Sequence, residues 1–97
     1  MTRHFVRVLC DVHCDWEGDP PDYRVFVNGE LFTERTFNFD NSYLQEMLQI
    51  EAPEGYYQIK YEIVPPSIAR LRVMNMRVDF GPAVLDGNIL RINNALA

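Results

Sequence analysis

The chain has 97 residues, of which 47% are hydrophobic and 12% aromatic, and its net charge is −5. This length predicts one domain, residues 1–97, that buries roughly two-thirds of the surface its unfolded form exposes. The acidic balance argues against nucleic acid and anionic membranes as partners, and no apolar run approaches the ~18 residues of a membrane span. The start of the chain lacks a signal-peptide core, so we expect a soluble protein without an export signal.

The first predicted element is a long strand from Thr2 to Cys14. Its residues alternate with period two, which places one set on a single face: Val6, Val8, Cys10, Val12 and Cys14. In one extended strand the α-carbons of Cys10 and Cys14 lie about 13 Å apart, at ~3.3 Å per residue, which is too far for a disulfide. We therefore expect reduced thiols and folding in a cytoplasm. The unpaired edges of this strand could also extend a neighbouring sheet.

The segment from Asp15 to Asp22, DWEGDPPD, interrupts the strand with an acidic loop that carries the only tryptophan, Trp16. Its alternating carboxylates could offer oxygen ligands to calcium, but they lack the full spacing of a calcium loop, so a solvated loop is favoured. Cys10, His13 and Cys14 lack the further ligands of a zinc site, which favours buried thiols. Trp16 is either an anchor into a partner surface or a lid over one end of the fold.

A hairpin is predicted from Tyr23 to Phe39. Asn28-Gly29 lies between two apolar-rich runs, and a type I′ turn needs positive φ at both of its central residues. The sequence Asp40-Asn41-Ser42 then predicts a turn.

A second hairpin is predicted from Tyr43 to Ile63. Residues 43–52 fit either a helical stripe or an alternating strand, and the pattern of residues 53–63 favours the strand. Pro53-Glu54-Gly55 is typical of a tight turn, and residues 56–63 alternate cleanly.

The run from Ile68 to Phe80 is another long alternating strand. Its phase slips near Asn75, which predicts a β-bulge. Asp86-Gly87-Asn88 predicts a further hairpin turn before a short strand, Ile89 to Ile92. The seven or eight strands predict an all-β fold, a small antiparallel β-sandwich with a jelly-roll-like layout, although an open barrel would show the same alternation.

Arginine accounts for all basic side chains except Lys60. The stripe Arg70, Arg72 and Arg77 could be a solvent-facing row paired with Glu34, Glu46 or Glu62, or part of a protein interface. The planar guanidinium pairs well when partly desolvated, which favours the interface. We therefore expect Trp16, Arg70, Arg72 and Arg77 to contact a partner. No nucleophile motif or assembled carboxylate pair is evident, so we expect neither an enzyme nor a cofactor or metal.

Three stretches, RVFVNGELFTERTF, YLQEMLQIEAPEGYYQIKYE and LRVMNMRV, resemble small virion structural proteins of tailed phages, particularly phages of cyanobacteria. The resemblance covers about Cys14 to Phe80. It implies a non-enzymatic capsid decoration or knob-like protein that assembles in the host cytoplasm and becomes part of the virion. Its partner would be the major capsid protein or another virion protein, with self-association left open. The hairpin patterns also resemble jelly-roll carbohydrate-binding modules, which would place a glycan at Trp16 and the acidic loop.

Overall fold

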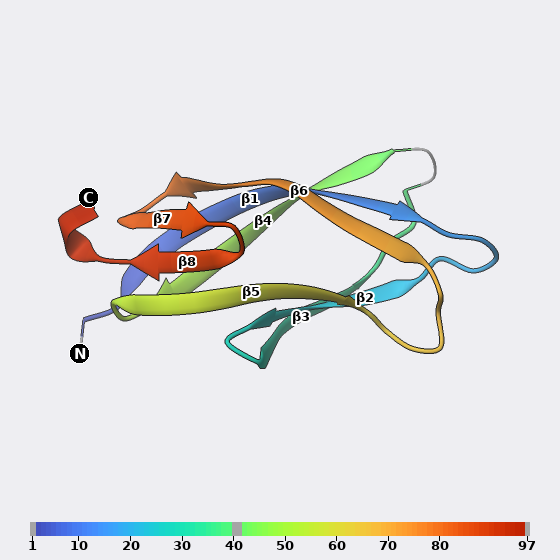
Figure 1. The fold of residues 1–97 in the computed structure, drawn as a ribbon, viewed down its shortest axis with the longest axis horizontal. Helices are drawn as coiled ribbons and strands as arrows, with labels where there is room; N and C mark the ends of the chain where they lie inside the picture. Colours follow the sequence, from blue (N-terminus) through green and yellow to red (C-terminus); the bar gives the residue numbers. More distant parts are fainter. Residues whose placement is uncertain (1, 40–41, 97) are drawn as a thin grey trace.

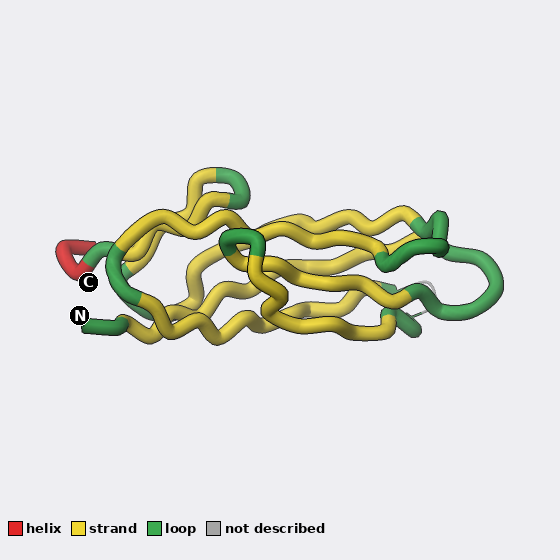
Figure 2. Tube along the Cα trace, turned by 90° about the horizontal axis from the view of Figure 1, so that it is seen from below, coloured by secondary structure: helices red, strands yellow, loops and turns green. Residues whose placement is uncertain are grey.

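The computed structural model describes residues 2–39 and 42–96 and consists almost entirely of strands in two antiparallel sheets (Figures 1 and 2). The molecule is elongated, with extents of 47 × 23 × 17 Å. The elements are β1 (His4–Asp15), β2 (Asp22–Val27), β3 (Glu30–Thr36), β4 (Tyr43–Ala52), β5 (Gly55–Ile63), β6 (Arg70–Phe80), β7 (Ala83–Asp86), β8 (Ile89–Ile92) and the 3-10 turn η1 (Asn94–Leu96). The predicted all-β sandwich is confirmed.

Of the predicted turn Asp40-Asn41-Ser42, the first two residues lie outside the described residues. In the part of the chain that is described, no helix is long and apolar enough to cross a bilayer.

One sheet has three strands in the order β4-β1-β6. The central strand β1 pairs with β4 from His4↔Ala52 to His13↔Tyr43, and with β6 from Arg7↔Phe80 to Asp15↔Arg70. Its even-numbered side chains point inward and are fully buried: Val6, Val8, Cys10 and Val12. Both edges of β1 are occupied, so the prediction that this strand offers a free edge is wrong. The reason is that β4 pairs with one edge of β1 and β6 with the other, while its apolar face packs against the second sheet.

The other sheet has five strands in the order β3-β2-β5-β8-β7. The predicted hairpin at Asn28-Gly29 is confirmed, with φ of 51° at Asn28 and 80° at Gly29. The turn also bonds to β5, since the main-chain N–H of Asn28 donates to the main-chain carbonyl of Gln58 over 2.8 Å. The short hairpin β7-β8 around Gly87 is likewise present, as its turn sequence predicts.

The second predicted hairpin, between β4 and β5, is wrong. The two strands belong to different sheets, because β4 pairs with β1 while β5 pairs with β2 and β8. Pro53 follows β4 directly and has no N–H to continue a ladder, so the chain crosses between the sheets there. The apolar faces of the two strands meet across the core, with Leu48 and Ile50 on one side and Ile59 on the other.

The predicted bulge near Asn75 is confirmed. Between the pairs Leu9↔Arg77 and Asp11↔Met74, strand β6 contains one more residue than β1. Asn75 takes a positive φ of 55°, and its side-chain amide donates to Oδ2 of Asp11 over 2.9 Å. The extra residue keeps Met74 and Arg77 on the same outward side, each opposite an outward residue of β1.

Candidate protein-interaction face

The side of the three-stranded sheet that points away from the core combines apolar and arginine side chains. Directly opposed residues in an antiparallel pair point to the same side, so the odd-numbered residues of β1 and their partners share this side. We call it the outer face, and define it by Phe5, Arg7, Leu9, Asp11, His13 and Asp15 of β1, Tyr43, Gln45, Met47, Gln49 and Glu51 of β4, and Arg70, Arg72, Met74, Arg77 and Phe80 of β6.

Large apolar side chains on the outer face are exposed to a degree that a solvated sheet does not require. The exposed fractions are 40% for Phe5, 52% for Tyr43, 46% for Met47, 46% for Met74 and 54% for Phe80. Aromatic residues, methionine and arginine are the types enriched in protein interfaces, where lysine is depleted. The only lysine, Lys60, lies on the other sheet. The outer face therefore has the composition of a protein-binding surface.

At the end nearest the N-terminus, the outer face is already partly ordered. The rings of Phe5 and Phe80 pack with centroids 5.9 Å apart, and the guanidinium of Arg7 lies 5.5 Å from the Phe80 ring centroid. The Nε atom of Arg7 lies 2.8 Å from Oδ2 of Asp79, an ion pair without hydrogen-bond geometry. A partner would bind there to two aromatic rings that are already packed in place, which lowers the side-chain conformational entropy lost on binding.

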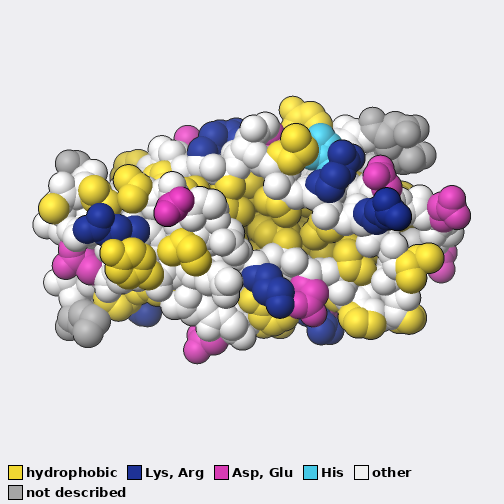
Figure 3. Space-filling view, in the orientation of Figure 1, with side chains coloured by type: hydrophobic (Ala, Val, Ile, Leu, Met, Phe, Trp, Pro, Cys, Tyr) yellow, Lys and Arg dark blue, Asp and Glu magenta, His cyan; other side chains and the backbone are white. Residues whose placement is uncertain are grey.

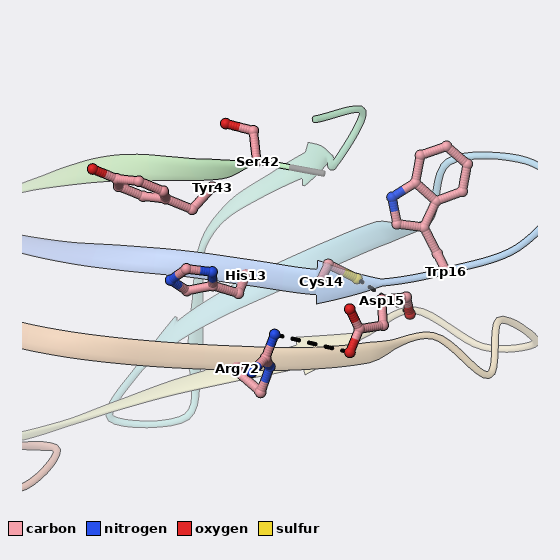
Figure 4. A pocket seen from close by; sticks show the side chains of 7 residues that line it. All are labelled: His13, Cys14, Asp15, Trp16, Ser42, Tyr43 and Arg72. Carbon is pink, nitrogen blue, oxygen red and sulfur yellow. Dashed lines mark hydrogen bonds and ion pairs between the residues drawn. The ribbon is translucent and has the colours of Figure 1, made fainter. Parts of the chain in front are cut away.

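The opposite end of the outer face contains a hollow of about 380 Å³. Tyr43, His13 and Arg72 lie side by side on three neighbouring strands (Figure 4), and the His13 and Tyr43 rings stack at 5.2 Å. Nη2 of Arg72 is 3.9 Å from Oδ2 of Asp15, and Trp16 follows in the loop. This hollow offers flat aromatic rings and one cation to whatever docks on it.

The four residues predicted to contact a partner reach related positions. Arg70, Arg72 and Arg77 all point outward from β6, opposite Asp15, His13 and Leu9. Trp16 lines the same hollow as Arg72 but is half-buried and packs against the core, so it forms a lid over this end of the sandwich. Whether any of the four contacts a partner stays a prediction.

The alternative in which these arginines pair with Glu34, Glu46 or Glu62 is wrong. Glu34, Glu46 and Glu62 bind cations of the other sheet instead, namely Arg24, Arg35 and Lys60. Glu34 and Glu62 lie on the other sheet, and Glu46 of β4 points into the core, whereas the arginines of β6 point outward. Arg77 donates to the carbonyl of Asn75, and within the described residues no carboxylate lies within ion-pair distance of it.

The outward side of the five-stranded sheet has a different character. It has two exposed ion pairs, Arg24 of β2 with Glu34 of β3 at 2.5 Å and Lys60 with Glu62 along β5 at 3.3 Å. Such paired charges are already satisfied by each other and by water. This side also exposes the apolar side chains Leu31, Tyr56 and Val84, so it differs from the outer face mainly in its paired charges.

A buried polar cluster, missed by the sequence analysis, joins the two sheets. Glu46 of β4 is buried; its Oε2 accepts from the hydroxyl of Tyr23 over 2.8 Å and lies 3.0 Å from Nε of Arg35. Its Oε1 accepts from the hydroxyl of Tyr61. Because the hydroxyl hydrogen of Tyr61 is donated to Glu46, the thiol of Cys10 donates to the Tyr61 oxygen, 3.1 Å away. Every member has a partner, so the cluster acts as a polar clamp across the core.

The clamp shifts the acid-base behaviour of its members. Burial raises the pKa of Tyr23, and the hydrogen bond to Glu46 raises it further. Burial also raises the pKa of Tyr61, together with its hydrogen bonds to Cys10 and Glu46. Burial raises the pKa of the Cys10 thiol as well. These groups therefore stay protonated in the folded protein at pH values where the unfolded chain releases its protons.

This difference predicts that the protein loses stability in alkaline solution. The unfolded thiol and phenols titrate near 9.0 and 10.0, so above those values the unfolded state binds fewer protons than the folded state. The free energy of unfolding should then fall by about 1.4 kcal/mol per pH unit for each phenol above pH 10. Urea titrations from pH 8 to 11 would measure this slope.

A matched pair of variants tests the origin of that slope. Tyr61→Phe removes one clamp phenol and should make the decline shallower, whereas Tyr56→Phe removes an exposed phenol and should not. A parent protein whose stability stays constant to pH 11 would contradict the prediction.

The other predicted sites give simpler results. Cys10 and Cys14 are both free thiols, which agrees with the expected absence of a disulfide. Among the described residues, which include the whole acidic loop, no three His, Cys, Asp or Glu side chains lie close enough together to hold a metal ion.

Comparison with known proteins adds no assignment, because no protein-family model, curated protein or solved structure matches the chain. The interpretation of the outer face therefore depends on its own geometry.

Proposed function

We propose that the protein is a non-enzymatic structural protein of a virion, which binds the capsid surface through the outer face of its three-stranded sheet. The observation that carries the proposal is the exposed set of aromatic, methionine and arginine side chains on one continuous sheet surface. The resemblance of the strand and turn sequences to phage virion proteins supports the choice of a capsid protein as partner. Free thiols are compatible with assembly in a reducing host cytoplasm.

A flat sheet face suits repeated attachment to a lattice. Each copy would present the same surface to an equivalent site, and a partner protein with an apolar patch rimmed by carboxylates would match the apolar residues and the arginines together. Repetition on the lattice would raise the total binding strength if neighbouring copies also touch.

The first test is the copy number of the protein in purified particles. Quantitative mass spectrometry against a labelled standard should give a fixed ratio to the major capsid protein. Absence of the protein from particles would overturn the proposal.

A charge reversal at Arg77 should weaken attachment. Arg77 is exposed in the middle of the outer face, opposite Leu9, and its guanidinium donates to the backbone carbonyl of Asn75 in its own strand. Central arginines are common binding hot spots, worth about 2 kcal/mol, so Arg77→Glu should lower affinity for particles that lack the protein by about thirtyfold or more. Sedimentation of added protein with such particles would measure the change.

The matched control reverses an arginine on the other sheet. Arg91→Glu alters an exposed arginine that stacks on Tyr56, with the guanidinium 6.0 Å from the ring centroid, and it should keep parental attachment. Equal losses for both variants would contradict a specific role for the outer face.

The hollow at Trp16 and Tyr43 favours glycan binding as a second candidate function. Sugars stack on aromatic rings, and Trp16 and Tyr43 line the hollow together with Arg72. Trp16→Ala should abolish glycan binding under this alternative but leave particle attachment intact under the first proposal. Glycan arrays probed with the parent protein would separate the two, since an empty array removes the alternative.

A further inference from the structure

One half of β5 has no strand on its second edge. Strand β8 covers β5 from Gly55 to Gln58, and the turn residue Asn88 continues the contact at Ile59 through its main chain and side chain. The main-chain N–H and C=O groups of residues 58, 60, 62 and 64 point toward β2. Gln58 bonds to Asn28, the residue after β2, and Val64 bonds to Asp22. By alternation, the N–H and C=O groups of Tyr61 and Ile63 point away from β2. Among the described residues, no strand pairs with them there.

Next to this free edge lies a groove of about 690 Å³, which has an apolar floor and polar side chains at its rim. It is lined by β5, by β6 and by the β7-β8 turn, and Figure 3 shows its hydrophobic floor as the hollow in the middle of the view. The β6 side chains Leu71, Val73 and Met76 point into it and remain partly exposed. The matching inward residues of β1, such as Val8 and Val12, are fully buried. The sandwich is therefore incomplete over this half of β6.

The shape of the gap is that of a missing strand. A segment placed there would continue the line of β8 along β5, with its backbone facing Tyr61 and Ile63. Every second side chain would then point inward onto Leu71, Val73 and Met76. Because Asn88 bounds the gap on one side and the 64–69 loop on the other, the segment would span about four to six residues.

We propose that an extended segment of a partner protein, with apolar residues at alternate positions, adds as a strand to the free edge of β5 and fills this groove. The occupant is a peptide because the edge offers ordered N–H and C=O groups, which bind another backbone better than they bind an aliphatic molecule. The alternation of the occupant follows from the groove, which is apolar on one side and open to water on the other. This surface is separate from the outer face, so it is a second contact in addition to the proposed one.

The test uses the amide hydrogens of the free edge in the parent protein. Synthetic seven-residue peptides in which threonine alternates with valine, leucine or isoleucine serve as probes, and hydrogen exchange is followed by NMR. At ten times its dissociation constant, a bound peptide should slow exchange at Tyr61 and Ile63 by about tenfold. The amide of Lys60, which faces β2, should change little.

Three outcomes would overturn the proposal. The first is that no peptide of the set slows exchange at Tyr61 and Ile63 at millimolar concentration. The second is that the same peptides with proline at alternate positions bind equally well, since proline lacks the required N–H. The third is that octanoate fills the groove, shifting the resonances of Leu71 and Val73, while peptides do not compete with it.

Two substitutions on one strand separate this groove from the outer face. Met76→Arg places a charged side chain in the groove and should reduce peptide affinity by at least about tenfold, while Met74→Arg on the outward side should not. Met74→Arg should instead weaken attachment to particles. Each of the two contacts can therefore be tested even if the other does not exist. The hydrogen-exchange measurement on the parent protein tests peptide binding at the free edge of β5 even if Met76→Arg does not fold.

Discussion

Replacing Glu46 with alanine is expected to lower the free energy of unfolding by about 3 kcal/mol, because each buried hydroxyl left without its acceptor costs about 1–3 kcal/mol. The change would leave the hydroxyls of Tyr23 and Tyr61 without their acceptor and Arg35 without its counter-ion. These groups come from β2, β5 and β3, whereas Glu46 belongs to β4, so the loss falls on the contact between the two sheets. Urea denaturation at pH 7 would measure it.

The control for this prediction removes an exposed glutamate. Glu34 forms a 2.5 Å ion pair with Arg24 on the surface, and exposed pairs of this kind contribute little to stability. Glu34→Ala should therefore change stability little. Glu46→Gln should lie between the two, because an amide keeps the volume but offers one acceptor oxygen instead of two. If Glu46→Ala and Glu34→Ala cost the same, the clamp is not what joins the sheets.

Replacing Gly81 with alanine is expected to lower the free energy of unfolding by about 3 kcal/mol or more. Gly81 lies where the chain leaves β6 for β7 and passes close to β1, with φ of +103°. A Cβ at this position would collide with the carbonyl oxygen of Phe5 and would lie 3.0 Å from the α-carbon of Val6. Both contacts are with backbone, so relief would require β1 and the turn to separate.

Gly87 supplies the comparison for Gly81. It also has a positive φ, +60°, but a Cβ there would meet no atom within 4 Å. Gly87→Ala should therefore cost about 1 kcal/mol, the conformational part alone. A thermal unfolding series would show whether the difference between the two variants comes from the close approach to β1. Similar losses at both sites would mean that φ, and not the contact with Phe5, sets the cost.

Local signals explain the parts of the fold that the sequence predicted correctly. Asn28-Gly29 forms its turn because both residues tolerate positive φ, and the phase slip around Asn75 appears as an extra residue in β6. Each of these features depends on a few neighbouring residues. The partner of each strand does not, which is why Pro53-Glu54-Gly55 was expected to close a hairpin and instead carries the chain to the other sheet.

The candidate sites divide in the same way. Alternation along β6, with the phase slip near Asn75, placed Arg70, Arg72 and Arg77 on one side, but the acidic neighbour of Arg72, Asp15, comes from β1 and could be known only from the sheet order. Alternation in β4 also placed Glu46 in register with Leu44 and Leu48, on the apolar face. That position could have indicated a buried carboxylate. Its partners lie on three strands of the opposite sheet, and no spacing in the sequence brings those strands together.

The central place of β1 has a consequence for synthesis on the ribosome. β1 is the first strand to leave the exit tunnel, yet its two neighbours are β4 and β6, residues 43–52 and 70–80. Strands β2 and β3 can pair as soon as they emerge, because only their turn separates them. The backbone edges of β1 must wait for these two strands to be translated. Until then its unpaired edges and apolar side chains, buried in the folded protein, can be bound by a chaperone.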